Sequence, residues 1–104
     1  MAKYIFVYKN KNDWTNLPKE HVMQMMQAWG EWLGSMGSAV VDQGEAFRAG
    51  GKTVSAEGIG SADDMTSGYT IVEAKDFDEA LAYAKKAPTL ERGGRVEVYE
   101  AFGM

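Results

Sequence analysis

The side chains best suited to proton transfer are His21 and Asp42. His21 is the only histidine of the chain, and an imidazole titrates close to neutral pH, which makes it a candidate general base. Asp42 follows Val40 and Val41, so we expect its carboxylate at a strand end, where it could face a pocket and abstract a proton. Each residue also has a plainer interpretation. A polar residue in the first turn of a helix is commonly just solvated, and an aspartate shortly before Gly44 commonly makes a turn.

Two tryptophans lie close together in the segment that we expect to form the first helix. Trp29 and Trp32 are three residues apart and therefore share one face of a helix. Their rings could wall a pocket for an aromatic or otherwise flat ligand, although tryptophans at helical spacing more often belong to the core. We expect the methionines of this segment to fill the core; they are Met23, Met25, Met26 and Met36.

Residue types exclude several other kinds of site. The chain has no cysteine, which rules out thiol chemistry, disulfides and cysteine-ligated metals. One histidine and scattered carboxylates, Asp63 and Asp64 among them, form no metal-ligand pattern. The glycines at 58 and 60 lack the third glycine of a dinucleotide-binding loop, and Gly51-Lys52-Thr53 lacks the first glycine of a phosphate-binding loop. We therefore expect neither a metal nor a cofactor.

Composition narrows the partners and the location. The net charge is −4, and an acidic surface repels phosphate backbones, so we expect no nucleic acid partner. The apolar run at residues 4–8 is too short for a membrane span or a signal peptide, so we expect no membrane partner. With 104 residues, 45% of them hydrophobic, the chain is expected to form one domain over residues 1–104. The lack of cysteine fits a reducing cytoplasm, which is the expected location.

Hydrophobic periodicity predicts the order strand, helix, short strand pieces, strand, helix, strand. Strands are expected where aliphatic and aromatic residues alternate, and helices where apolar residues recur at steps of three and four. Pro18, with Asn16 as a cap, begins the first helix and Gly37 ends it; Asp76 caps the second helix and Pro88 ends it. The expected strands are 3–8, 40–41, 53–57, 69–74 and 95–100, with a glycine-rich loop over 58–68.

The first strand has large apolar residues on both faces. Tyr4, Phe6 and Tyr8 lie on one face, and Ile5 and Val7 lie on the other. Two helices can cover only one face of a sheet of four or five strands. If the helices cover Ile5 and Val7, the three aromatic rings need a second copy of the chain as their cover. The sequence therefore predicts an α+β fold with both helices on one sheet face, and an obligate homodimer that packs sheet to sheet.

The order and spacing of short motifs resemble the YCII-related domain family from Tyr4 to Glu100. The segments that carry this resemblance are Lys3-Tyr4-Ile5-Phe6, Ala28-Trp29-Gly30-Glu31-Trp32-Leu33-Gly34, Gly37 followed by Val41-Asp42, Lys52-Thr53-Val54, Gly68-Tyr69-Thr70-Ile71-Val72-Glu73-Ala74, Asp78-Glu79-Ala80, Pro88-Thr89-Leu90 and Gly93-Gly94-Arg95-Val96-Glu97-Val98. The resemblance implies a ferredoxin-like βαββαβ fold, with an antiparallel sheet and two helices on one face. It also implies that two copies pair as a dimeric α+β barrel.

The same resemblance implies an activity. One relative is a dehydrochlorinase acting on a chlorinated aromatic ring, so the chain is expected to be a cofactor-free small-molecule enzyme using acid/base chemistry, either a lyase or dehydrochlorinase-like. Asp42 would handle the proton, with His21 as the second candidate. Trp29 and Trp32 would shape a pocket between the first helix and the sheet. On this view, replacing Asp42 with Asn abolishes turnover.

Two departures from the family pattern bear on that expectation. Relatives often read Asp-Gly-Gly where this chain has Asp42-Gln43-Gly44, and Cys-Pro-His-Leu where it has Ala87-Pro88-Thr89-Leu90. Thr89 would then occupy the place of the missing histidine beside the substrate. The absence of that histidine favours an alternative function, in which the chain is a non-catalytic small-molecule-binding or regulatory module.

Overall fold

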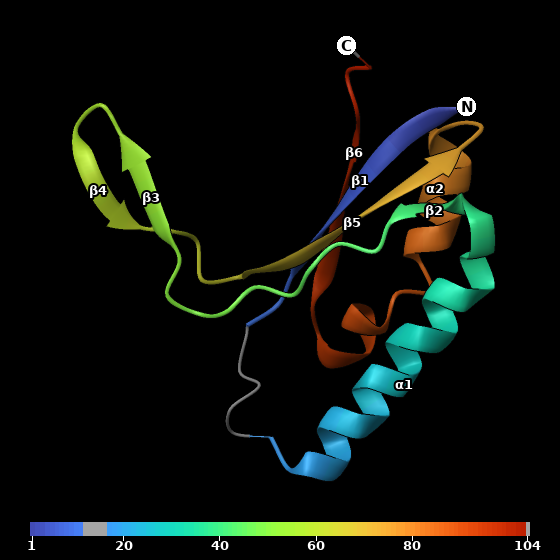
Figure 1. Ribbon diagram of the computed structural model, residues 1–104, viewed down its shortest axis with the longest axis horizontal. Helices are drawn as coiled ribbons and strands as arrows, with labels where there is room; N and C mark the ends of the chain where they lie inside the picture. The colour runs from blue at the N-terminus through green and yellow to red at the C-terminus, as the bar shows by residue number, and fades with distance from the viewer. Residues whose placement is uncertain (12–16, 104) are drawn as a thin grey trace.

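The computed structural model describes residues 1–11 and 17–103, and these form a four-stranded antiparallel sheet, a separate two-stranded sheet and two α-helices (Figure 1). The elements are β1 (Ala2–Lys9), α1 (Lys19–Met36), the 3₁₀ turn η2 (Gly37–Ala39), β2 (Val40–Asp42), β3 (Lys52–Ser55), β4 (Gly58–Ser61), β5 (Thr66–Ala74), α2 (Phe77–Ala84), the 3₁₀ turn η3 (Pro88–Arg92) and β6 (Arg95–Glu100). The main sheet has the order β2-β5-β1-β6. With the β3–β4 hairpin set aside, this is the antiparallel βαββαβ arrangement that was expected.

β1 turns its aromatic residues toward the helices. Tyr4, Phe6 and Tyr8 are only 2%, 0% and 5% exposed. Phe6 stacks on Trp32 of α1 with 6.1 Å between ring centroids, and Tyr4 meets Phe77 of α2 edge-on at 5.4 Å. The expectation that these rings face away from the helices is therefore wrong. The helices cover the larger side chains because that choice removes more apolar area from water.

The other face of the main sheet is not covered by the helices. Ile5 and Val7 point to this side, where they pair with Ile71 and Tyr69 of β5. All four are half-buried, and Tyr99 of β6, which pairs with Ile5, is 52% exposed. We call these five residues the open face. The aromatic rings of β1 therefore do not need the second copy that was predicted to cover them, and the apolar side chains left partly in water are those of the open face.

The predicted signals at the helix ends are largely confirmed. Asp76 caps α2, since its Oδ1 accepts a hydrogen bond of 2.9 Å from the backbone N–H of Glu79. Gly37 ends α1 with a φ of 57°, a backbone conformation that favours glycine. Pro18 lies immediately before α1, and the predicted cap Asn16 lies outside the described residues.

The segment predicted as a loop over 58–68 contains a strand, so that part of the prediction is wrong. β4 pairs with β3 in a register that runs from Lys52 opposite Ser61 to Ser55 opposite Gly58. The glycines at 58 and 60 hide this strand from sequence patterns, because glycine is disfavoured in strands. Figure 1 shows the hairpin projecting from the body on the side away from α1 and α2.

α1 buries only some of the apolar side chains that were expected in the core. Trp32 and Met36 are buried, whereas Met23 and Met26 are 60% and 66% exposed. The expectation that Met23 and Met26 fill the core is therefore wrong. Neither α1 nor any other helix of the described residues is long and apolar enough to cross a membrane.

Candidate functional site

A cleft of about 370 Å³ lies between α1 and the edge of β5, beside the first half of β5. This is where the sequence predicted a pocket, between the first helix and the sheet. α1 contributes Met26, Trp29 and Leu33 to one wall. The segment 43–46, which follows β2 and runs along β5, forms the opposite wall. The volume of the cleft lies at the small end of the range for ligand sites, which suits a ligand of about one ring.

Gly44 allows the segment 43–46 to approach β5 this closely. Its φ is +77°, and a Cβ atom placed on it would overlap the carbonyl oxygen of Tyr69. The next residue is paired to the same strand, since the carbonyl of Glu45 accepts a 3.3 Å hydrogen bond from the N–H of Tyr69. A larger residue at position 44 would push the segment away and open this wall of the cleft.

A chain of hydrogen-bonded hydroxyl groups lies at the cleft. Thr70 Oγ1 is 2.9 Å from the carbonyl oxygen of Gln43, and because a carbonyl only accepts, Thr70 donates its single proton there. The hydroxyl of Tyr8 is 2.6 Å from Thr70 Oγ1 and must therefore be the donor in that bond. We call Tyr8, Thr70 and the Gln43 carbonyl the hydroxyl chain. Both of its protons are committed, so the Tyr8 oxygen can only accept a hydrogen bond from a ligand.

The hydroxyl chain is neutral and does not relay protons. Burial raises the pKa of the Tyr8 phenol well above its ordinary value, against a smaller opposing effect of the hydrogen bond to Thr70. The phenol is therefore protonated at any physiological pH. The hydroxyl chain ends at the backbone carbonyl of Gln43, which cannot take up a proton at neutral pH. These groups can accept a hydrogen bond but cannot take up a proton, so removing a proton from a bound molecule would require another group.

The two candidate tryptophans have different positions. Trp29 lines the cleft and lies edge-on to Tyr8, with 4.7 Å between ring centroids. Trp32 is 5% exposed, stacks on Phe6 and donates from its indole N–H to the carbonyl of Tyr83 at 3.0 Å. The structure therefore puts Trp29 at the cleft wall and Trp32 in the core behind it.

Asp42 ends β2, directly before the segment 43–46. Its Oδ1 accepts from the N–H of Gly44 at 2.9 Å, which is the turn predicted from sequence, and its Oδ2 accepts from the hydroxyl of Tyr69 at 3.0 Å. Donation to Asp42 is the main cause of a raised pKa at Tyr69. Side chains alternate along β5, and Thr70 points toward the helices. The Asp42–Tyr69 pair therefore lies on the opposite sheet face from the hydroxyl chain.

His21 and Thr89 lie away from the cleft. His21 is exposed in the first turns of α1 and lines a separate groove of about 270 Å³, together with Glu91 and Arg92. Trp29 lines both hollows and stands between them. Thr89 is 4% exposed on η3, and its backbone carbonyl accepts from the N–H of Gly94 at 3.1 Å. Neither residue is among those that line the cleft.

The predicted site residues thus do not converge on one point. Trp29 alone of the five lines the cleft, and Asp42 adjoins it through the backbone. Within residues 1–11 and 17–103, no group of three or more His, Cys, Asp or Glu side chains is placed to hold a metal ion. The residues that sequence reasoning missed are Tyr8 and Thr70. A hydroxyl on an otherwise apolar strand face was the available signal, but it needed the β1–β5 register, which brings the two strands together.

The comparison with known families matches the model of the YCII-related domain over residues 1–104. The chain belongs to the YCII-related domain family. No curated protein matches this YCII-related domain significantly. One similar solved structure is the 5-chloro-2-hydroxyhydroquinone dehydrochlorinase of Burkholderia phenoliruptrix AC1100, determined in complex with 2,5-dihydroxybenzoquinone. It is 21% identical, with a TM-score of 0.53, and the match covers 93% of this chain and 90% of that one. At this identity, the similarity supports the fold alone.

The two departures of this YCII-related domain from the family pattern have local explanations in the structure. Gln43 takes part in the hydroxyl chain through its backbone carbonyl, so the bond does not depend on which side chain stands there. Thr89 packs its methyl group against the backbone of Gly94, where a Cβ atom would come within 2.6 Å of it. A buried threonine at this position contributes packing to the turn before β6.

Proposed function

We propose that the chain is a cofactor-free enzyme that binds a small, flat, hydroxyl-bearing organic molecule in the cleft and removes a proton from it. The observation that carries this proposal is the hydroxyl chain beside Trp29. Tyr8 gives its own proton to Thr70, so its oxygen offers only lone pairs, and a ligand must donate to it. The edge-on rings of Tyr8 and Trp29 favour a flat ligand.

The family adds support of a limited kind. The dehydrochlorinase that shares the fold was solved with 2,5-dihydroxybenzoquinone, which is a flat ring carrying hydroxyl groups. That ligand has the chemistry that the cleft would accept, namely hydroxyl donors on a planar ring of small volume. It is therefore a reasonable first probe for this chain.

Proton removal is assigned to Asp42. Each of its carboxylate oxygens accepts one hydrogen bond, from Gly44 or from Tyr69, and keeps a further lone pair. The side chain is exposed on the edge strand β2, at the border of the open face, so a substrate can reach it from the side of the sheet. Because Asp42 lies on the far side of the edge formed by the segment 43–46, a substrate must carry a group that extends from the ring in the cleft over that edge. The roles foreseen for His21 and Thr89 stay predictions.

Binding is tested by calorimetric titration with 2,5-dihydroxybenzoquinone and other hydroxylated aromatic compounds. Tyr8→Phe removes the acceptor and should weaken binding about fivefold, since a lost hydrogen bond costs about 1 kcal/mol. Tyr99→Phe is the matched control, because that hydroxyl donates to Glu97 at 2.8 Å on the open face. Equal affinity of Tyr8→Phe and the unmodified protein would contradict a ligand site at the hydroxyl chain.

Catalysis is tested on the compounds that bind. Asp42→Asn should bind them within about twofold of the unmodified protein and lose turnover by a factor of about 100 or more, the usual worth of a general base. Unchanged turnover in Asp42→Asn contradicts its role. The alternative, a non-catalytic binding module, is favoured by the neutral hydroxyl chain, which holds a ligand and passes no proton. Binding without turnover of any compound by the unmodified protein would support that alternative.

We further propose that the working unit is a homodimer, a dimeric α+β barrel in which two open faces pack together. Ile5, Val7 and Ile71 are apolar and only half-buried within one chain, so a second copy would remove them from water. Charges of both signs border this face, with Lys3 opposite Glu73 near one end. Such a mixed border is compatible with pairing of like copies. The cytoplasmic location expected from the lack of cysteine stays a prediction.

A further inference from the structure

The hairpin β3–β4 presents an apolar pair to solvent. Val54 and Ile59 are opposite one another in its register, so both side chains stand on one face of the hairpin. They are 79% and 74% exposed. In the main sheet, the most exposed large apolar residue is Tyr99, at 52%.

The composition of the hairpin is unlike that of a solvated arm. Over residues 52–61, only Lys52 and Glu57 carry charge. A two-stranded hairpin is at best marginally stable alone in water, and apolar strands with exposed edges and little charge invite pairing with other chains. A hairpin of this composition is stable and soluble when something covers its apolar face.

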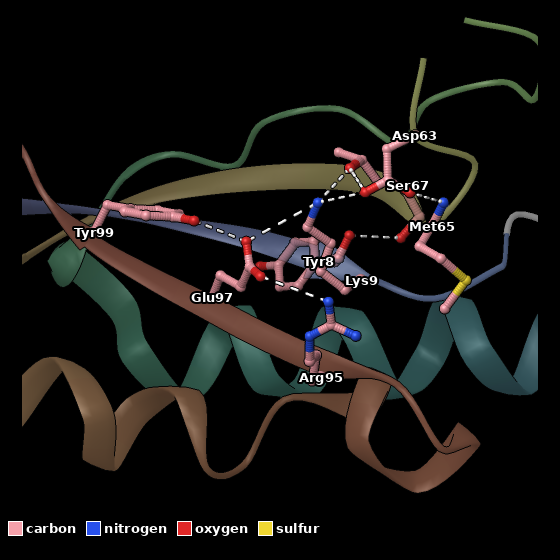
Figure 2. Close-up of polar contacts among 9 residues, drawn as sticks. Tyr8, Lys9, Asp63, Met65, Ser67, Arg95, Glu97 and Tyr99 are labelled. Atoms are coloured by element: carbon pink, nitrogen blue, oxygen red, sulfur yellow. Dashed lines mark hydrogen bonds and ion pairs between the residues drawn. The ribbon is translucent and has the colours of Figure 1, made fainter. Parts of the chain in front are cut away.

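The root of the hairpin is anchored to the body, so the hairpin has a set direction. Lys9 of β1 pairs with Asp63 at 2.9 Å and donates to Thr66 Oγ1 at 2.6 Å (Figure 2). The N–H of Ala62 donates to the carbonyl of Gly51 at 3.0 Å and closes the base of the hairpin. An arm fixed at its root and free at its tip is suited to reach a neighbouring molecule.

The area of the whole sheet face that carries the open face also indicates that a dimer would use the hairpin. Four strands spaced about 4.8 Å apart, each contributing about six residues of 3.3 Å, cover roughly 400 Å². Two such faces bury about 800 Å² in total, whereas stable interfaces bury about 1,200–2,000 Å². By this flat-sheet measure, contact between the two sheets alone falls below that range, and a second contact region from each chain would bring the dimer into it.

We propose that the β3–β4 hairpin is an arm that packs the Val54–Ile59 face against a second copy of this chain. This inference rests on the proposed homodimer and names the part of each chain that completes its interface. Every copy carries both the arm and the open face, so one two-fold arrangement covers both at once. The loop of residues 47–51 connects the segment 43–46 to the arm, so arm docking would also hold this wall of the cleft in place.

The test compares two lysine substitutions at neighbouring positions of the arm. Val54→Lys puts a charge on the apolar face, and Thr53→Lys puts the same charge on the other face, because side chains alternate along β3. Dimer dissociation is measured by sedimentation over a concentration series, with circular dichroism as a check of folding. We expect Val54→Lys to raise the dissociation constant at least tenfold and Thr53→Lys to change it less than about twofold. If Val54→Lys perturbs folding, Val54→Thr, which keeps the shape of the side chain, should still raise the constant several-fold.

Three outcomes decide the matter. Selective weakening by the Val54 substitutions supports the arm. A dimer that both Val54 substitutions leave intact overturns the arm and leaves the sheet-to-sheet dimer standing. An unmodified protein that is monomeric throughout the series overturns both the arm and the dimer, while the ligand site in the cleft is unaffected.

Discussion

At the scale of single residues, the proposed ligand preference of the cleft depends on Tyr8. The phenol is buried, keeps its proton and donates it to Thr70, so its oxygen can only accept a hydrogen bond, and we expect it to favour ligands whose hydroxyl groups donate. This property depends on a register between β1 and β5 that no local pattern reveals. Asp42, by contrast, was identifiable from its place after two valines. The sequence predicted both its turn and its chemistry, and the structure shows the turn through the bond to Gly44.

Gly44 provides a residue-scale prediction about stability. Gly44→Ala should lower the free energy of unfolding by at least about 2 kcal/mol, since alanine is strained at a φ of +77° and its methyl would overlap the Tyr69 carbonyl. Gly34→Ala is the control, because a Cβ atom at this helical position meets nothing within 4 Å; it should stabilise by about 0.5–1 kcal/mol. Urea unfolding measures both. A neutral Gly44→Ala would show that the wall of the cleft is not tightly placed.

At the scale of elements, the hairpin is the part that sequence reasoning resolved least. Strand-like residues were recognised at 53–57, but their partner strand holds two glycines and was expected to be a loop. The two helices, in contrast, followed from periodicity and caps, because Asp76 and Gly37 act through contacts with their own neighbours in the chain. Local signals are readable from sequence, and pairing between distant segments is not.

The root of the hairpin provides an element-scale prediction about pH. The hydrogen bond from Lys9 is the main cause that lowers the pKa of Asp63, with a second contribution from the N–H of Met65. A lowered folded-state pKa means that this anchoring is fully present above the unfolded pKa, about 3.9, and is lost as pH falls through the lower folded value. In Lys9→Met, the titration midpoint of Asp63 should move upward toward the ordinary value. NMR titration of the Met65 amide reports it, with Lys3→Met as the charge-matched control; equal midpoints in all three proteins would contradict the anchor.

At the scale of the whole molecule, the decisive feature is which face of β1 the helices cover. Alternation alone could not tell, because both faces are apolar. The structure shows the aromatic residues in the core and Ile5 and Val7 on the open face. The argument for a partner that was made from the aromatic rings therefore no longer holds, and the proposed dimer rests on the half-buried side chains of the opposite face.

The corrected orientation makes a prediction that separates core from interface. Ile5→Lys should give a folded monomer of 11.4 kDa, because a lysine on the open face can extend its amine into water. Phe6→Glu should instead unfold the chain, since Phe6 is 0% exposed and a buried charge there has no partner among the packed rings. The unmodified protein should sediment at twice the chain mass. Sedimentation and circular dichroism of the three proteins at micromolar concentration check this, and a stable folded Phe6→Glu monomer would contradict the assignment of faces.

The central claim is that the cleft between α1 and β5 binds a small hydroxylated ring, and NMR shift mapping tests it most directly. Titration with 2,5-dihydroxybenzoquinone should shift the indole N–H of Trp29 and the amides of Gly68, Thr70 and residues 43–46, which line the cleft. These shifts should saturate and should need about fivefold more ligand in Tyr8→Phe. Shifts confined to the groove of His21 and Arg92, or no saturable shifts with any hydroxylated aromatic compound, would contradict the account.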